Sequence, residues 1–472
     1  MLLLHILPLA IVIVAQSADD LLVSTQSGPV KGHYVPGKPT VREFLGIPYG
    51  APPVGDLRWA PAIQPPRWNT PLEAKAFSPA CYNVVPTGYD LGASPTIVNT
   101  PKPFAEDEDC LSLNVWAPTA ARLKYGGAAV MLWMHGGAFA RGGAFISVYN
   151  GANIVRDQED IILVTFNYRL GIFGFPGASV FGNKANPALH DVRSAIEWVR
   201  DNIASFGGDP KKITLFGFSA GGTATEIYLY SHEKDPIIHA AIIESSTITI
   251  RQQNKTVATG EWNKLAAGAN CTHTSDYEQL ACLRAIPASR IREVANVNKL
   301  SFIPVPDGGP FKTDNEVRLR SGRFSHIPLL VGNNNEEIQT PGIGVADTQG
   351  IFTCTSARSA RFHAHYGKTW QYRYFGNFPV GNWTNPGAYH GSEVEQVFGT
   401  YLEKSATYFQ RKSSRYMQAV WTAFAKDPIN GLSRLGLPTY NAQRKTLIRL
   451  AYENVPGATL VRPGEYEDGC DL

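Results

Sequence analysis

The sequence predicts a doubly wound α/β fold, in which helices flank a mainly parallel β-sheet. The first observation behind this prediction is a set of short apolar runs spaced along the chain. Continuous apolar runs of this length are typical of strands that are buried on both faces of a parallel sheet. The runs lie at residues 129–134, 161–166, 213–216, 240–243 and 327–331.

The second observation is an amphipathic segment at residues 190–205, between the second and third runs. Its apolar residues recur at helical spacing, which predicts a crossover helix with one face on the sheet. They are Val192, Ala195, Ile196, Val199 and Ile203. Functional side chains in such folds gather at the carboxyl ends of the strands. The residues that follow each run are therefore the first candidates for a site.

Composition places the chain among large globular proteins. It has 472 residues, of which 44% are hydrophobic and 18% are charged. No linker, repeat or charge block divides it, so we expect a single domain over residues 18–472. The net charge of +3 is spread thinly. Neither nucleic acid nor an anionic membrane is therefore an expected partner.

The N-terminus carries an apolar run at residues 2–15, followed by small side chains up to Ser17. This pattern predicts a signal peptide over residues 1–17, and hence a secreted, extracellular protein. The alternative is a membrane anchor. A bilayer core needs about 20 apolar residues, so this shorter run predicts no stable membrane insertion.

The six cysteines suit an oxidising compartment. Sequence proximity favours two short loops, each closed by a disulfide, and leaves the last two cysteines for each other. The favoured pairs are Cys81 with Cys110, Cys271 with Cys282, and Cys354 with Cys470. A metal site is the alternative, but the chain has no C-x-x-C and no paired histidine spacing. We therefore expect no metal.

Three Asn-x-Thr sequons also agree with passage through a secretory pathway. They lie at Asn254, Asn270 and Asn382, and each is a predicted glycosylation site.

A candidate nucleophile follows the run at 213–216. The pentapeptide G-F-S-A-G at 217–221 puts Ser219 at a sharp turn from a strand into a helix. Small neighbours let strand, turn and helix approach closely, as a nucleophile elbow requires. The alternative interpretation is a glycine-rich surface loop with an incidental serine.

A serine hydroxyl needs a base to take its proton, and the base needs a third group to hold its tautomer. His390 is the favoured base, because it lies in a glycine-flanked loop that precedes a predicted helix. His363 and His365 are more simply solvated residues on a helix face. The acid should follow a strand end, where Glu336 and Glu337 both suit the chemistry and both could equally be solvated loop charges.

A glycine-rich turn at 135–139 follows the run at 129–134. With the N–H of Ala220, its amides could bind the oxyanion of a tetrahedral intermediate. A nucleotide-binding interpretation fails, because no G-K-[ST] occurs and no acidic residue is placed for a ribose. We expect no cofactor.

Several further segments, taken in order, carry a family resemblance. They are F-L-G-I-P-Y at 44–49, P-P-V-G-D-L-R-W at 52–59, E-D-C-L-S-L-N-V at 108–115, N-Y-R-L-G at 167–171 and F-G-G-D-P at 206–210. With the elbow, they make the chain resemble a type-B carboxylesterase of the cholinesterase-like α/β-hydrolase family, closest to its secreted fungal members. The resemblance covers nearly the whole mature chain and implies an α/β-hydrolase fold.

The resemblance implies a role for each candidate. Ser219 would be the nucleophile and His390 the base, and Glu337 rather than Glu336 would be the acid, because 332–337 matches the family's G-x-N-x-x-E. The oxyanion donors would be Gly137, Ala138 and Ala220. The same resemblance agrees with the three disulfides and implies a structural ion pair between Arg58 and Glu108.

Three departures from the family pattern bear on the substrate. Phe218 stands where relatives usually have a glutamate, which makes the pocket more apolar and disfavours cationic substrates. The loop between Cys81 and Cys110 has no tryptophan to hold a quaternary ammonium. The segment 337–352 is shorter than in relatives, by what resembles a helical section. A cholinesterase is therefore not expected.

The predicted activity is hydrolysis of small-molecule or lipid carboxylic esters by a secreted serine hydrolase, through an acyl-enzyme. One alternative is a lipase or sterol esterase that acts on long-chain esters. Residues 82–109 show no sustained helical period, however, and so predict no amphipathic lid. A second alternative is a noncatalytic binding protein on the same fold.

Overall fold

The computed structural model describes residues 19–84, 104–124, 126–248, 252–338, 348–380 and 386–472. The predicted signal peptide, most of the first disulfide loop and Asn382 lie outside these residues. None of the described helices is long and apolar enough to cross a membrane.

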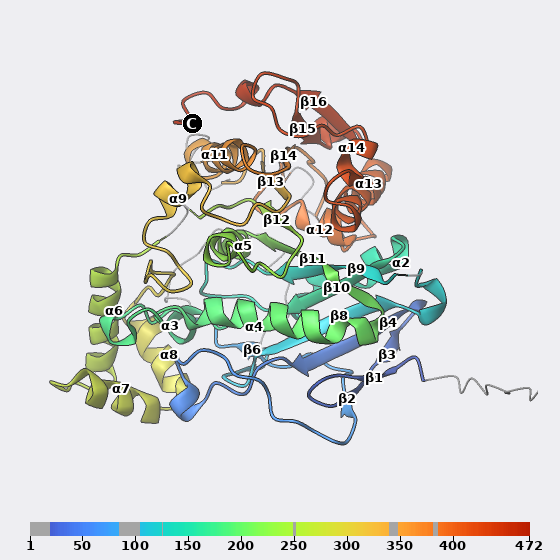
Figure 1. The fold of residues 1–472 in the computed structure, drawn as a ribbon. Helices are drawn as coiled ribbons and strands as arrows, with labels where there is room; N and C mark the ends of the chain where they lie inside the picture. Colours follow the sequence, from blue (N-terminus) through green and yellow to red (C-terminus); the bar gives the residue numbers. More distant parts are fainter. Residues whose placement is uncertain (1–18, 85–103, 125, 249–251, 339–347, 381–385) are drawn as a thin grey trace, which may run out of the picture.

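The described residues form an eleven-stranded sheet with the strand order β16-β15-β14-β13-β12-β11-β9-β10-β8-β4-β3 (Figure 1). The strands from β15 to β10 in this order run parallel, and the strands at the two edges pair antiparallel. Their bounds are β3 His33–Val35, β4 Lys38–Pro48, β8 Ser112–Pro118, β9 Ala128–Met134, β10 Ile161–Phe166, β11 Gly208–Phe218, β12 Ala240–Glu244, β13 Leu329–Asn334, β14 Thr369–Tyr374, β15 Leu447–Leu450 and β16 Ala458–Val461.

The remaining strands form two small sheets. One contains β1 Leu22–Ser24, β2 Pro29–Lys31 and β5 Leu72–Glu73, and the other contains β6 Ala80–Cys81 and β7 Glu106–Asp107. The described α-helices are α2 Ala152–Asp157, α3 Gly171–Gly174, α4 Pro187–Asn202, α5 Ala220–Ser231, α6 Lys255–Gly268, α7 Asp276–Ala285, α8 Ala288–Val297, α9 Asn315–Ser321, α11 Cys354–His363, α12 Val394–Phe398, α13 Tyr408–Lys426 and α14 Gly431–Arg434.

The five apolar runs that predicted parallel strands are confirmed as β9 to β13. The run at 327–331 begins as a strand only at Leu329, since Pro328 has no N–H to donate to a neighbouring strand. The predicted crossover helix is α4, which begins three residues earlier than expected, with Pro187 in its first turn. A 3-10 helix at Ile203–Phe206 continues it.

Two hydrophobic cores lie on opposite faces of the sheet, because successive side chains of a strand point to opposite sides. Along β9, Val130 and Leu132 enter the core under α4, α5 and α11, whereas Met131 and Trp133 enter the core under α2, α12 and α13. Figure 1 shows these two helical layers on either side of the strands. Burial on both faces explains why the strands read as continuous apolar runs.

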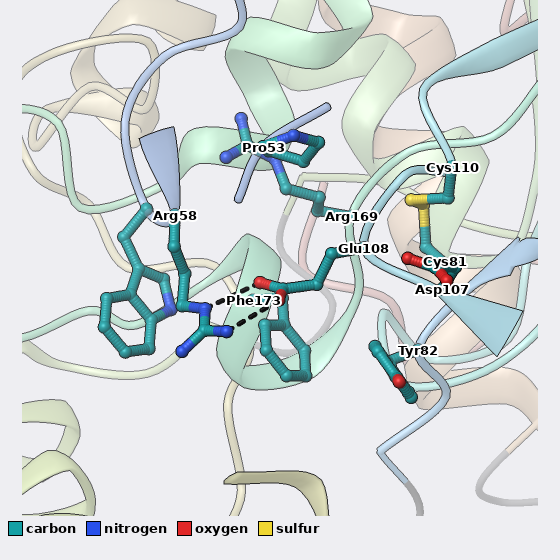
Figure 2. Close-up of a pocket in the computed structure, with 10 residues that line it drawn as sticks. Pro53, Arg58, Cys81, Tyr82, Asp107, Glu108, Cys110, Arg169 and Phe173 are labelled. Atoms are coloured by element: carbon teal, nitrogen blue, oxygen red, sulfur yellow. Dashed lines mark hydrogen bonds and ion pairs between the residues drawn. A yellow bond between two sulfur atoms is a disulfide. The ribbon is translucent and has the colours of Figure 1, made fainter. Parts of the chain in front are cut away.

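The ion pair implied by the resemblance is present. Arg58 donates from Nε and Nη2 to the two carboxylate oxygens of Glu108, each at 2.6 Å. The pair lies in a small hollow beside the Cys81–Cys110 disulfide (Figure 2). The guanidinium also donates to backbone carbonyls that include that of Ile286, and so ties this region to the segment between α7 and α8.

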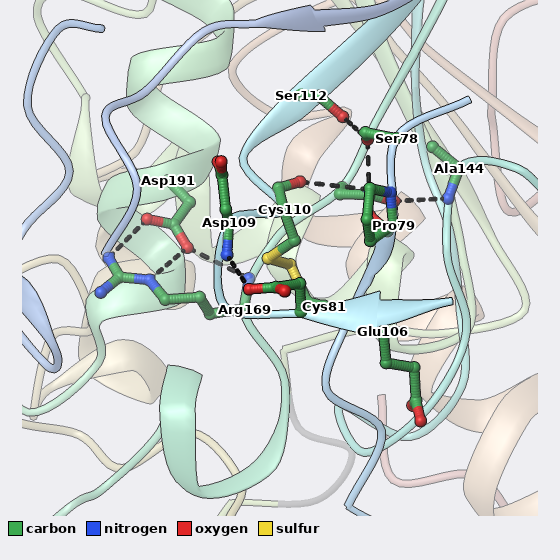
Figure 3. Close-up of a disulfide and its surroundings, with 12 residues drawn as sticks. Ser78, Pro79, Cys81, Glu106, Asp109, Cys110, Ser112, Ala144, Arg169 and Asp191 are labelled. Carbon is green, nitrogen blue, oxygen red and sulfur yellow. Dashed lines mark hydrogen bonds and ion pairs between the residues drawn. A yellow bond between two sulfur atoms is a disulfide. The ribbon is translucent and has the colours of Figure 1, made fainter. Parts of the chain in front are cut away.

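The three disulfides of the structure join the cysteine pairs that sequence proximity favoured. Cys81–Cys110 closes the first loop beside β8 (Figure 3). Cys354–Cys470 fastens the C-terminal segment to the start of α11. Two of the predicted glycosylation sites, Asn254 and Asn270, are exposed. Asn254 caps α6 by accepting a hydrogen bond from the N–H of Val257 at 2.8 Å.

A buried ion pair holds the N-Y-R-L-G segment to α4. Arg169 donates to both carboxylate oxygens of Asp191, at 2.8 Å from Nε and 2.6 Å from Nη2 (Figure 3). The exposed fractions of the two side chains are only 3% and 0%. Neither charge can be rehydrated if its partner is lost.

We expect Asp191→Asn to lower the free energy of unfolding by about 3–5 kcal/mol, because it leaves the Arg169 charge buried without a counter-ion. Chemical denaturation measures this loss. Asp235→Asn is the matched control, since that carboxylate is 74% exposed in its pair with Arg193. The control should cost no more than about 1 kcal/mol. Equal losses in the two variants would contradict the prediction.

Candidate active site

Ser219 lies on the tight turn between β11 and α5. Its φ of 55° is in the left-handed region, which is strained for a residue with a side chain. The turn is fixed from both sides. The N–H of Ser219 donates to the carbonyl of Glu244 at 2.9 Å, and a Cβ added at Gly221 would lie 2.1 Å from the carbonyl oxygen of Met134. The hydroxyl is therefore held at the carboxyl end of the sheet, where it remains partly exposed.

His390 lies in the loop between β14 and α12, and its imidazole bridges two side chains. Its Nε2 is 2.9 Å from Ser219 Oγ, and its Nδ1 is 2.6 Å from Glu337 Oε2. Both distances lie within hydrogen-bonding range. Because the carboxylate can only accept, Nδ1 carries the proton and Nε2 is free to accept one from the serine.

The structure brings Glu337 to the histidine and leaves Glu336 exposed. The side chain of Glu337 is fully buried. Its second carboxylate oxygen, Oε1, accepts from the N–H of Asn334 at 2.6 Å. With one oxygen held by the backbone, the other is directed at the imidazole.

Two aromatic rings pack against the imidazole of His390. The ring centroid of Phe218 is 4.5 Å from it, and that of Phe352 is 5.0 Å from it. Phe218 was singled out in the sequence because of its place beside the nucleophile. Phe352 was not, because nothing in the pattern of residues 348–353 points to a contact with a residue 38 positions later in the chain.

The glycine-rich turn after β9 passes directly beside the elbow. A Cβ added at Gly136 would lie 2.9 Å from the Cβ of Ser219. Gly137 and Ala138 both have positive φ values, of 120° and 56°. Among the described residues, the N–H groups of Gly137, Ala138 and Ala220 donate to no acceptor. Three amides are thus available to a negatively charged oxygen next to the serine.

His135 supports this turn as a neutral ring. Burial lowers its pKa to about 4, so it is uncharged at neutral pH. Its Nδ1 donates to the carbonyl of Gly136 at 2.8 Å. The ring stacks on Tyr168, whose hydroxyl donates to the carbonyl of His135 at 2.8 Å.

Two buried carboxyl groups lie beneath the histidine loop. Burial and the nearby charge of Glu337 raise the pKa of Glu393 to about 7. Burial and the nearby Glu393 raise the pKa of Glu244 well above its usual range. Ser245 Oγ donates to Glu393 at 3.2 Å, and Trp421 Nε1 donates to Glu244 at 2.7 Å. No motif in the sequence pointed to this pair.

The prediction of a solvated helix face was wrong for His363. Its side chain is 2% exposed, and its ring centroid lies 4.0 Å from that of Phe324. The helix α11 packs on β13 and β14 and turns His363 inward. His365, two residues later, is exposed as expected. In the described part of the chain, His363 lies 3.5 Å from Glu226 and His365 is bonded to the carbonyl of Arg361, whereas Ser219 Oγ is bonded to His390. Among the described residues, no cluster of three or more His, Cys, Asp or Glu side chains could hold a metal ion.

The sheet topology and the strand-to-helix elbow define an α/β hydrolase. Solved structures of PNB esterase share this fold, one of them with a TM-score of 0.79 and 27% sequence identity, over 95% of this chain and 98% of that chain. The protein belongs to the carboxylesterase family, whose sequence model matches residues 19–349, and it is a carboxylic ester hydrolase.

Named relatives agree with this assignment. The chlorogenic acid esterase of Aspergillus niger is 32% identical over 455 residues, which cover 89% of this chain and 85% of that protein. Secreted lipase 5 of Gibberella zeae is 32% identical, and the match covers 96% of this chain and 95% of that protein. The para-nitrobenzyl esterase of Bacillus subtilis is also 32% identical, with coverage of 92% and 96%.

Proposed function

We propose that the protein is a secreted serine esterase that cleaves carboxylic esters through an acyl-enzyme on Ser219. The observation that carries the proposal is the continuous hydrogen-bonded chain from Ser219 through His390 to Glu337. A serine, a base within hydrogen-bonding reach and a buried acid that orients the base together form an activated nucleophile.

In the first half of the reaction, Ser219 Oγ attacks the ester carbonyl as its proton moves to His390 Nε2. The imidazolium that forms is stabilised by the Glu337 carboxylate, which accepts from Nδ1. The negative charge on the former carbonyl oxygen is met by the amides of Gly137, Ala138 and Ala220. Each such donor is worth about 3–4 kcal/mol in comparable sites.

Collapse of this intermediate breaks the bond to the alcohol oxygen, which takes the proton from His390 as it leaves. Water then repeats the sequence: it gives a proton to His390, attacks the acyl carbonyl and releases the acid while Ser219 regains its proton. The nucleophile, the base and the oxyanion donors are all supplied by the chain itself, so the proposal requires no metal or cofactor.

Secretion is supported by three disulfides, by exposed sequons and by the apolar N-terminal run. Secreted lipase 5, which aligns over 96% of this chain, adds to this support. The substrate class that fits best is neutral esters of small molecules or lipids. The aromatic rings of Phe218 and Phe352 around the histidine supply no counter-charge to a cationic alcohol.

A lipase is the second candidate, favoured by the same fungal relative. Residues 85–103, where an amphipathic lid would lie, are outside the described residues. A noncatalytic binding protein is less well supported, because the three side chains lie at hydrogen-bonding distances that a binding function would not require.

The test combines covalent labelling with an ester series. An alkyl fluorophosphonate should add one phosphonyl group per chain, on the peptide that contains Ser219, and hydrolysis should stop in proportion. p-Nitrophenyl esters from two-carbon to long acyl chains should be hydrolysed in solution. A sharp rise in rate only on emulsified long-chain esters would identify a lipase. Absence of both labelling and hydrolysis in the folded protein would overturn the proposal.

A further inference from the structure

We propose that Asn334 is a positioning residue for ester hydrolysis: it fastens the loop of the acid to the loop of the base and so sets the Glu337–His390 hydrogen bond. This inference rests on the proposed function, because it assigns Asn334 a role in the same triad. Asn334 is the last residue of β13 and is completely buried.

The backbone of Asn334 acts on the acid. Its N–H donates to Glu337 Oε1 at 2.6 Å, while Oε2 of the same carboxylate lies 2.6 Å from His390 Nδ1. A carboxylate held at one oxygen by a rigid strand end cannot rotate freely at the other. The direction of the acid toward the imidazole therefore depends on where β13 ends.

The side chain of Asn334 acts on the base. Its amide Nδ2 donates to the carbonyl of Tyr389 at 2.7 Å, and Tyr389 immediately precedes His390. The same amide donates to the carboxylate of Glu393, three residues after His390. An amide group has two hydrogens, and here both go to the segment that carries the histidine, one on each side of it.

Asn334 thus contacts both the loop of Glu337 and the loop of His390, although these two residues are 53 positions apart in the chain. A further backbone bond, from the N–H of Glu336 to the carbonyl of Ala388 at 3.0 Å, lies at the edge of the same contact. That bond fixes the distance between the loops. The orientation of the histidine segment is fixed by the two donors of Asn334.

The charges around the amide make a donor necessary at this position. Nδ2 faces a carbonyl oxygen and the buried carboxyl group of Glu393, which lies near Glu337, Glu244 and His390. A side chain without N–H groups would leave both acceptors buried and unpaired, which is unfavourable. We expect the histidine segment to shift in order to regain a partner.

The test compares Asn334→Ala and Asn334→Ser with Asn333→Ala. Asn333 is a matched control, because it is buried at the same strand end but its side chain donates to Thr353 Oγ1 and to the backbone carbonyl of Asn334. Within the described part of the histidine loop, Asn333 has no hydrogen-bond partner. Melting temperatures, kcat and KM on a short-chain p-nitrophenyl ester, and the rate of fluorophosphonate labelling are measured for each variant.

We expect Asn334→Ala to lower kcat and the labelling rate by about 10–100-fold, as comparable supporting residues do, with KM changed far less. Asn334→Ser, which keeps one donor, should fall between Asn334→Ala and the wild type. The downfield proton resonance of His390 Nδ1–H should move or broaden in both Asn334 variants and stay in place in Asn333→Ala.

The inference is overturned if Asn334→Ala labels at the wild-type rate. It is also overturned if Asn333→Ala, at an equal loss of melting temperature, loses as much kcat. Should Asn334→Ala fail to fold, Asn334→Ser decides by the same two criteria. Failure of the wild type to label at Ser219 would instead refute the proposed function, so the two results are distinguishable.

Discussion

Ser219→Ala is expected to lower kcat for ester hydrolysis by about a millionfold, the size of loss found when a triad serine is removed. Without Oγ no acyl-enzyme can form, and His390 is left to act on water alone. The three amides that we propose as oxyanion donors are unaffected, so a small residual rate over uncatalysed hydrolysis should remain. KM should change little, because the substitution removes a single oxygen atom and leaves the surrounding side chains unchanged.

The measurement is steady-state hydrolysis of a short-chain p-nitrophenyl ester, with active sites counted by fluorophosphonate titration. Ser231→Ala is the control. That serine is the last residue of α5, at the end of the helix away from the elbow, and its hydroxyl donates to the carbonyl of Ile227 at 2.6 Å. The control should hydrolyse the ester at the wild-type rate. Activity of Ser219→Ala above about one hundredth of that rate would mean that the nucleophile lies elsewhere.

The elbow could be predicted because its requirements are local. A tight strand-to-helix turn needs small residues within two positions of the serine, and Gly217 and Gly221 supply them. The parallel strands were predictable for a similar reason. Burial on both faces gives each of the strands β9 to β13 a continuous apolar stretch, whereas the parallel strand β14, with the sequence TWQYRY, has none. The antiparallel edge strands, such as β3 and β16, combine exposed and buried residues, so no continuous apolar run predicted them.

The choice between Glu336 and Glu337 could not be made from residue chemistry. Both are loop carboxylates after the same strand, and only the path of the chain directs one inward. The G-x-N-x-x-E pattern of the family supplied what local physics did not. The same pattern contains Asn334, so its place in the motif was a signal for the positioning residue that we now propose.

The error at His363 has the same origin. A helix face is solvated or buried according to what packs on it, and α11 packs on β13 and β14, with Phe324 covering the imidazole. Phe324 is 39 positions earlier in the chain. The residue pattern of α11 gives no sign of that contact. Only the three-dimensional structure could show that His363 is buried.

Glu337→Gln is expected to lower kcat by about 10⁴-fold, the loss seen when a triad carboxylate becomes an amide. The geometry here gives the reason. The N–H of Asn334 requires an acceptor at the Oε1 position, so the glutamine places its oxygen there and its NH₂ group toward His390 Nδ1. The imidazole must then carry its proton on Nε2, where it can no longer accept one from Ser219.

Glu336→Gln is the matched control, one residue away and exposed, and its kcat should stay within about twofold of the wild type, as expected for a surface substitution. Glu337→Gln should keep its melting temperature, since the amide fills the same space and removes a buried charge. Fluorophosphonate labelling should slow together with kcat, because attack by Ser219 needs the same base in both reactions. Labelling at the wild-type rate with kcat lowered would place the defect in deacylation and contradict the tautomer argument.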